Sequence, residues 1–155
     1  MSKELTINNH IYEAKGTFAF SRQAKKYAEN EADKGQSDGV TTIFMGLLQL
    51  DPEYLVKFWH CATAHHKESK LAIEDIEAKI EEIAEQEGDL TPYFKSALEV
   101  LNEGGYFKGK FQNLWFMMNN QIKKQKGEEK EKTQSQIEML KEMYKNTTGK
   151  APFGQ

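Results

Sequence analysis

The chain has 155 residues, of which 38% are hydrophobic and 29% charged, and its formal net charge is −3. This length predicts one domain with a core of its own, and the slight excess of polar residues suggests that part of the chain lies outside that core. The charge lacks the basic excess typical of nucleic-acid-binding proteins, and the single cysteine, Cys61, excludes an intrachain disulfide.

No stretch of the sequence has the length and apolar character of a secretory signal or a membrane-spanning helix. The longest apolar stretches are interrupted by the polar residues Gln49, Asp51 and Lys57. We therefore expect a cytoplasmic protein.

The first 40 residues predict a β-hairpin followed by a helix. Asn8-Asn9 is a typical turn dipeptide, because asparagine tolerates a positive φ, and the flanking residues form strand-like runs. An isolated hairpin is marginally stable in water, so this one should pack on helices. Apolar residues at helical spacing then predict a helix over residues 18–32, which the turn-forming residues 33–39 close.

Two apolar helices are predicted next. Residues 40–50 are apolar around much of the helix, which favours a central position, and Gly46 would allow another helix to approach closely. Asp51 and Pro52 predict the start of a helix over residues 52–65. The carboxylate can accept hydrogen bonds from unpaired amides, and proline needs no amide donor at the first helical position.

Three further helices follow. The fourth has a stripe of isoleucines within residues 71–84 on a glutamate-rich background, and Gly88 suits the left-handed position after its end. Thr91-Pro92 predicts the start of a fifth helix, which Gly104-Gly105 ends. A sixth helix is predicted to begin near Lys108.

No apolar residue occurs between Lys123 and Lys132, so we expect a domain boundary near Gln125. Residues 1–125 would form a helical domain with an N-terminal hairpin. Residues 126–155 would form a charged linker, a short helix and a mobile tail. The predicted fold class is α+β and predominantly α, with about six helices, a short N-terminal β-hairpin and a flexible C-terminal helix.

The most enzyme-like cluster consists of His60, Cys61, His65 and His66. Cys61 and His65 would share one helix face, and zinc accepts this ligand pair, but a structural zinc site needs four ligands, usually from two separated pairs. We favour a partly buried cysteine with solvated histidines, and a small metalloprotein is an alternative. The glutamates and Asp75 of the fourth helix mostly lie off its apolar stripe, so we interpret them as a solvated face. We predict no catalytic residue, no cofactor and no metal.

One segment departs from an ordinary amphipathic pattern. Residues 115–118 are all aromatic or methionine and would point in every direction around a helix. Such a helix is either fully buried or has an exposed part that meets a partner, since aromatic residues and methionine are enriched at interface cores. The predicted partner-binding residues are Tyr106, Phe107, Phe111, Trp115, Phe116, Met117 and Met118.

The opening sequence also resembles a known family. Residues 5–15 (LTINNHIYEAK), followed by Phe18-Ala19-Phe20 and Lys25-Lys26-Tyr27, look like the start of tail assembly chaperones from long-tailed phages of Gram-positive bacteria. The similarity is one of pattern and order, and it continues to about residue 101. Its later parts lie at residues 39–56, 72–77 and 90–101.

The resemblance implies a non-enzymatic chaperone, with residues 1–125 as its chaperone-like domain. Such a protein binds the tape-measure protein, and we expect tail-tube subunits as further partners during tail morphogenesis. It works in the host cytoplasm, self-associates, and is absent from the mature particle. We expect neither nucleic acid nor membrane as a partner. The alternative is a small helical regulatory protein that binds nucleic acid, which would need a basic recognition helix.

Overall fold

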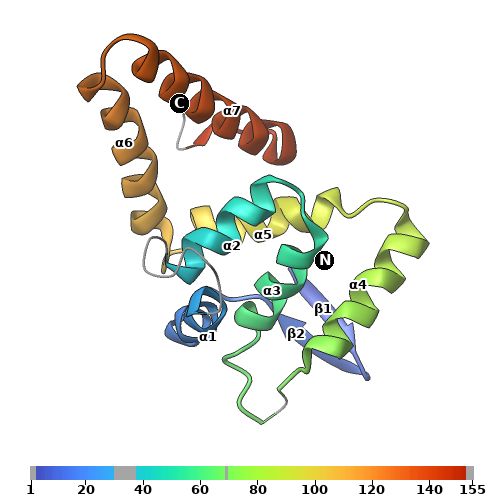
Figure 1. Cartoon of the computed structure of the whole chain (residues 1–155). Coiled ribbons are helices and arrows are strands. Elements are labelled where there is room, and N and C mark those ends of the chain that lie inside the picture. Colours follow the sequence, from blue (N-terminus) through green and yellow to red (C-terminus); the bar gives the residue numbers. More distant parts are fainter. Residues whose placement is uncertain (1–2, 30–37, 69, 153–155) are drawn as a thin grey trace.

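The structure is a computed structural model and describes residues 3–29, 38–68 and 70–152. These residues form seven helices and one antiparallel hairpin (Figure 1), where the sequence predicted about six helices and a flexible C-terminal one. A predominantly helical chain with an N-terminal hairpin is therefore confirmed. The elements are β1 (Glu4–Ile7), β2 (His10–Glu13), α1 (Phe18–Glu29), α2 (Gly39–Leu48), α3 (Pro52–Ala62), α4 (Ile73–Glu87), α5 (Thr91–Glu103), α6 (Lys108–Lys124) and α7 (Gly127–Thr148).

The hairpin turns at Asn8 and Asn9, as predicted. Their φ angles of 53° and 63° are those of a two-residue turn that matches the twist of the strands. Leu5 pairs with Tyr12 across the two strands, and both side chains are buried together with Ile7. One face of the hairpin therefore joins the core, and β1 also contacts α4.

Helix α2 lies at the centre of the molecule and packs against α1, α3, α5 and α7. Its apolar residues are almost fully buried, which confirms the predicted central position. A Cβ atom at Gly46 would overlap the ring of Tyr54, so glycine is required for the close approach of α3. The helix ends at Leu48 rather than at residue 50, because Leu50 adopts a φ of 56° as the chain turns toward Pro52.

Helix α3 begins as predicted, since Asp51 Oδ1 accepts a hydrogen bond from the Glu53 amide at 3.0 Å. It ends at Ala62, earlier than the predicted residue 65. The reason is local: the Thr63 hydroxyl donates to the Trp59 carbonyl at 2.7 Å, and tighter turns continue the chain after it.

Helix α4 ends at Gly88, whose φ of 73° confirms the predicted left-handed position. Thr91 is the first residue of α5 and not its cap. The cap position is Leu90, which makes no side-chain cap hydrogen bond, and Asp89 before it accepts hydrogen bonds at Oδ1 from both the amide and the hydroxyl of Thr91. The predicted end of the first helix at residue 32 lies outside the described residues, as does most of the predicted loop over residues 33–39, although Gly39 already begins α2.

Helix α7 differs most from expectation. It runs for 22 residues and begins immediately after Gln125 and Lys126, where the sequence suggested a charged linker and a short helix. Lysine and glutamate are good helix formers, and Ile137 and Tyr144 bury one side of the helix against the domain. Helix α7 contacts α2, α5 and α6. The domain boundary near Gln125 remains a prediction.

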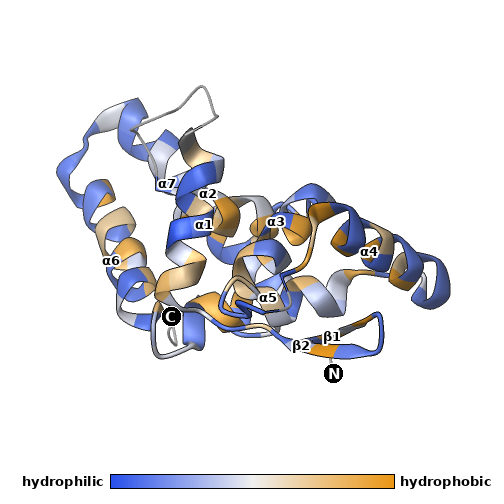
Figure 2. Cartoon of the chain, turned by 90° about the horizontal axis from the view of Figure 1, so that it is seen from below, coloured by the Kyte–Doolittle hydropathy of each residue, from blue (hydrophilic) through white to orange (hydrophobic). Residues whose placement is uncertain are grey.

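The tail also differs from the expectation of a mobile end. Thr147 and Thr148 belong to the last turn of α7 and are buried, and residues 153–155 lie outside the described part. In Figure 2, hydrophobic and hydrophilic bands alternate along α4, which projects at one end of the molecule, away from α6 and α7. None of the described helices is both long and apolar enough to cross a membrane.

Candidate functional site

Three of the seven predicted partner-binding residues belong to the core. Phe107, Phe111 and Trp115 are at most 3% exposed, because their spacing of four residues places them on one face at the start of α6. This face meets α2, where the ring centroids of Phe44 and Phe111 lie 4.4 Å apart. In the folded chain these three side chains are packed in the core and stabilise the domain.

The other four predicted residues are more accessible. Tyr106, Phe116 and Met117 are exposed, and Met118 is partly buried against the core. Phe116 and Met117 lie on the outer face of α6. Partner binding by these four residues remains a prediction.

Tyr106 lies next to Phe18, the first residue of α1 and one of the apolar residues from which that helix was predicted. The ring centroids of Phe18 and Tyr106 are 4.9 Å apart in an edge-to-face arrangement, yet Phe18 is 70% exposed and Tyr106 is 40% exposed. We call these two residues the aromatic pair. The missed signal was the spacing: Phe18 and Phe20 are two residues apart, so they cannot face the same side of a helix.

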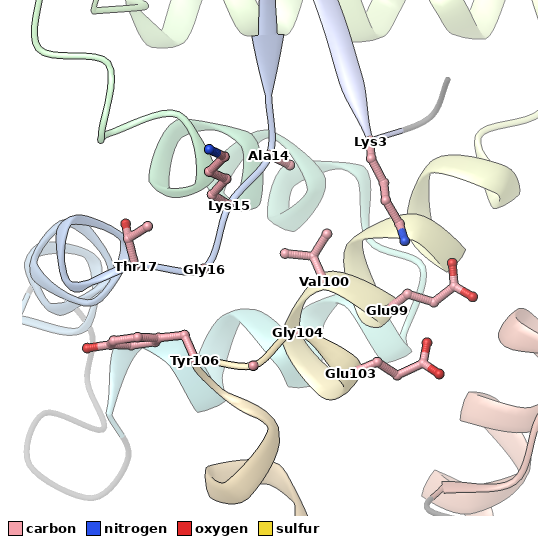
Figure 3. Close-up of a pocket in the computed structure, with 11 residues that line it drawn as sticks. Lys3, Ala14, Lys15, Gly16, Thr17, Glu99, Val100, Glu103, Gly104 and Tyr106 are labelled. Atoms are coloured by element: carbon pink, nitrogen blue, oxygen red, sulfur yellow. The ribbon is translucent and has the colours of Figure 1, made fainter.

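A groove of about 360 Å³ adjoins the aromatic pair. It runs between the extended segment after β2 and the C-terminal end of α5 (Figure 3), and small or aliphatic residues form much of its lining. At Gly16 a Cβ atom would lie 2.8 Å from the ring of the buried Phe107, so a side chain there would have to displace a core residue. The groove is lined by Lys3, Ala14, Lys15, Gly16, Thr17, Glu99, Val100, Glu103, Gly104, Gly105 and Tyr106.

The two ends of the groove differ in chemistry. Figure 3 shows Tyr106 at one end, and the carboxylates of Glu99 and Glu103 together with the Lys3 side chain at the other. These glutamates are one helical turn apart on α5, and the ammonium group of Lys150 lies 3.1 Å from an oxygen of each. Hydrogen bonds to Glu99 and Glu103 raise the pKa of Lys150 above its ordinary value. We call the two glutamates the acidic pair.

A comparison with protein-family models now gives a decisive match. The model described as phage tail assembly chaperone protein, TAC, matches residues 4–115. The chain belongs to this family. No curated protein and no solved structure matches it.

The match confirms the resemblance to tail assembly chaperones and extends it into α6. It includes the aromatic pair, the acidic pair and every groove residue of the chaperone except Lys3. Helix α7 and Lys150 lie outside the matched residues. Nearly all of the groove therefore lies within the residues that match the family model, and Lys150, which pairs with its acidic pair, does not.

Cys61 of the chaperone lies in the core, and burial raises the pKa of its thiol. The predicted solvated histidines are instead partly buried. His60 Nδ1 lies 2.6 Å from the hydroxyl of Tyr27, and burial raises the pKa of Tyr27 to about 12. The rings of His65 and His66 contact each other at a tilt of 40°, with centroids 4.2 Å apart. Among the described residues, no three histidine, cysteine or carboxylate side chains come together as metal ligands would.

The acidic helix α4 of the chaperone agrees with its interpretation as a solvated face. Ile76, Ile80 and Ile83 are buried, and its carboxylates are all exposed. These carboxylates contribute charge and hydration at one end of the molecule. The carboxylates concerned are Glu74, Asp75, Glu77, Glu81, Glu82, Glu85 and Glu87.

Proposed function

We propose that this chaperone binds the tape-measure protein through the aromatic pair and the adjoining groove, and keeps it soluble until tail-tube subunits assemble around it. Membership of the tail assembly chaperone family carries the general role. The observation that supports this site is an exposed aromatic pair within the matched residues, beside a groove that a partner side chain can enter.

Physical chemistry supports a binding role for this surface. Exposing two large aromatic side chains to water is unfavourable, so a partner that covers them gains binding free energy. Aromatic residues also contribute much of the binding free energy at many interfaces. A holder of an apolar partner must also stay soluble, and the exposed carboxylates of α4 serve that need.

Family membership also suggests where the chaperone works and what else it binds. The chaperone acts without catalysis or cofactor in the cytoplasm of the infected or lysogenic host, which we take to be Gram-positive, and it is released before the particle matures. Tail-tube subunits are its second partner, and it self-associates. Of these partners, we assign the tape-measure protein to the groove.

Co-expression with the tape-measure protein of the same phage tests this proposal. The chaperone should bring that protein into the soluble fraction and co-purify with it, and the double variant Phe18→Ala/Tyr106→Ala should lose most of this effect. Ile11→Ala is the matched control, because Ile11 is also exposed but lies on the hairpin. The proposed site is wrong if Phe116→Ala/Met117→Ala abolishes solubilisation while the aromatic-pair variant retains it. The function itself is wrong if no complex forms with the unaltered chaperone.

A further inference from the structure

Two histidines that follow α3 meet the hairpin in a cluster of rings. The ring centroids of His66 and Tyr12 lie 5.1 Å apart, and those of His66 and His10 lie 6.0 Å apart. His65 extends the group, since its ring contacts that of His66. We call His10, Tyr12, His65 and His66 the histidine cluster. It joins β2 to the irregular segment after α3.

Two ring nitrogens of the histidine cluster, His65 Nδ1 and His66 Nε2, are buried without a hydrogen-bond partner among the described residues. A neutral imidazole carries one proton on its two nitrogens, so each of these buried atoms can be the unprotonated one. Protonation would turn that atom into a charged donor without an acceptor, which is far more costly to bury. The closed cluster therefore favours neutral rings.

We propose that the histidine cluster is a pH-sensitive switch, which holds the hairpin on the end of α3 while His65 and His66 are neutral and opens when they are protonated. Opening means that residues 4–15 lose their contact with residues 62–66 while the helical core stays folded. Ala14 and Lys15 also line the groove, so opening displaces one of its walls. The inference concerns the chaperone alone and does not depend on the proposed function.

The charges that face the histidine cluster disfavour a proton on His65. Burial lowers the pKa of His65, and repulsion from His66 and Lys15 adds to this effect. The Ala62 carbonyl and Glu13 act in the opposite direction, but more weakly. Other charged groups on the neighbouring elements are Glu4 on β1, Lys67 and Glu68 after the cluster, and Asp75, Lys79 and Glu82 of α4 beside the hairpin turn.

The hairpin depends on its contacts with the helices. A two-stranded hairpin is marginally stable by itself, and such elements open locally at a lower free energy than the whole domain. Beside the histidine cluster, the amide of Lys15 donates to the Ala62 carbonyl at 3.0 Å. Below about pH 6.5 the open state binds more protons than the closed one, so opening should become easier as the pH falls.

Hydrogen–deuterium exchange of the full-length chaperone at pH 7.5 and 5.5 measures this opening, after correction for the intrinsic pH dependence of amide exchange. A histidine that is protonated only in the open state raises the opening constant about tenfold at one pH unit below its ordinary pKa. Protection of residues 4–15 should therefore fall about tenfold or more, and it should stay below that of α2 and α5. Protection that is independent of pH, or equal to that of α2 and α5 at pH 5.5, overturns the inference.

Glutamine variants locate the effect. His65→Gln/His66→Gln should remove most of the pH dependence at residues 4–15, because glutamine does not titrate. His60→Gln is the matched control, since His60 is also a partly buried histidine but lies next to the hydroxyl of Tyr27 and not the hairpin. It should leave the response of the hairpin unchanged. The inference is wrong if the double variant responds like the unaltered chaperone, or if His60→Gln alone removes the response.

A nuclear magnetic resonance titration of the unaltered chaperone needs no substitution, so it decides the matter even if the double variant does not fold. The amide shifts of residues 4–15 should change with the same midpoint as the ring protons of His65, and that midpoint should lie below the ordinary histidine value of 6.5. Hairpin shifts that stay constant while His65 titrates contradict the switch. Neither experiment includes a tail protein, so failure of the switch leaves the proposed function standing, and failure of the co-expression test leaves the switch standing.

Discussion

Asn102 connects three helices through a buried side-chain amide. Its Nδ2 donates to the hydroxyl of Tyr144 on α7 at 2.9 Å, and its Oδ1 accepts from Trp115 Nε1 on α6 at 3.3 Å. The rings of Tyr144 and Trp115 also contact each other edge to face. One residue of α5 thus satisfies the polar atoms of two buried aromatic side chains.

Replacing Asn102 with alanine should destabilise the chaperone by about 1–3 kcal/mol, because a donor on Trp115 and the hydroxyl of Tyr144 would be left unpaired in the core. Urea unfolding followed by tryptophan fluorescence measures the change. Asn113→Ala on the exposed side of α6 is the control and should alter the free energy of unfolding by less than about 0.5 kcal/mol. Equal effects of the two variants would show that the buried amide is not a structural link.

We expect the chaperone to lose stability at mildly acidic pH because of two partly buried histidines, His60 and His65. Burial lowers the pKa of His60, with repulsion from Lys26 adding to it, and burial with the neighbouring charges of His66 and Lys15 lowers the pKa of His65. Both groups protonate near 6.5 in the unfolded chain and only at lower pH in the folded one. The unfolded chain therefore binds more protons below about pH 6.5, and the free energy of unfolding should fall as the pH drops from 6.5.

Thermal unfolding between pH 7.5 and 5 measures this effect. The midpoint should stay level above about pH 6.5 and decline below it by a few degrees. His60→Gln/His65→Gln should flatten the decline. Asp38 does not affect this measurement. Its pKa is lowered from the ordinary aspartate value of 3.8, so it stays ionised over the whole pH range of the experiment. A midpoint that rises on acidification contradicts the assignment.

At the scale of single elements, two glycines should respond to alanine in opposite ways. At Gly46 in α2 the new methyl group would overlap the Tyr54 ring, so Gly46→Ala should destabilise by about 1–3 kcal/mol. At Gly109 in α6 no described atom lies within 4 Å of the new methyl group, so Gly109→Ala should stabilise by up to about 1 kcal/mol through the unfolded chain. Differential scanning calorimetry of both variants shows whether each substitution raises or lowers the stability. A stabilising Gly46→Ala would contradict the close packing of α2 and α3.

Elements that depend on local chemistry could be predicted from the sequence. The turn at Asn8-Asn9, the start of α3 at Asp51-Pro52 and the end of α4 at Gly88 each follow from the conformational preference of one or two residues. Helix α7 could not be predicted at its full length. Its first ten residues, before Ile137, include no apolar side chain, so its periodicity is weak. Its order depends on the packing of Ile137 and Tyr144 against a surface built by distant helices.

The candidate site was only partly predictable for the same reason. Tyr106 stood out in the sequence because it begins an aromatic segment, but its neighbour Phe18 is 88 positions earlier and meets it only through the tertiary fold. The seven-residue set mixed core and surface, since Phe107, Phe111 and Trp115 share composition with Phe116 and Met117 but face α2. The groove joins two segments far apart in the chain, which no local pattern reveals.

At the scale of the whole molecule, the acidic helix and the groove occupy different places. The solvated, acidic α4 projects at one end, α6 and α7 lie toward the other (Figure 2), and the groove lies between the extended segment after β2 and α5. The family match includes every groove residue except Lys3 and stops within α6, so nearly all of the surface proposed to hold a partner lies inside the matched part. The proposed partner surface is therefore separate from the solvated face of α4.

Hydrogen–deuterium exchange of the chaperone, alone and bound to the tape-measure protein, tests this account most directly. We predict slower exchange in the complex at residues 14–18 and 99–106, which contain both walls of the groove and the aromatic pair. Unchanged exchange there, with protection confined to α4 or to the outer face of α6, would contradict it.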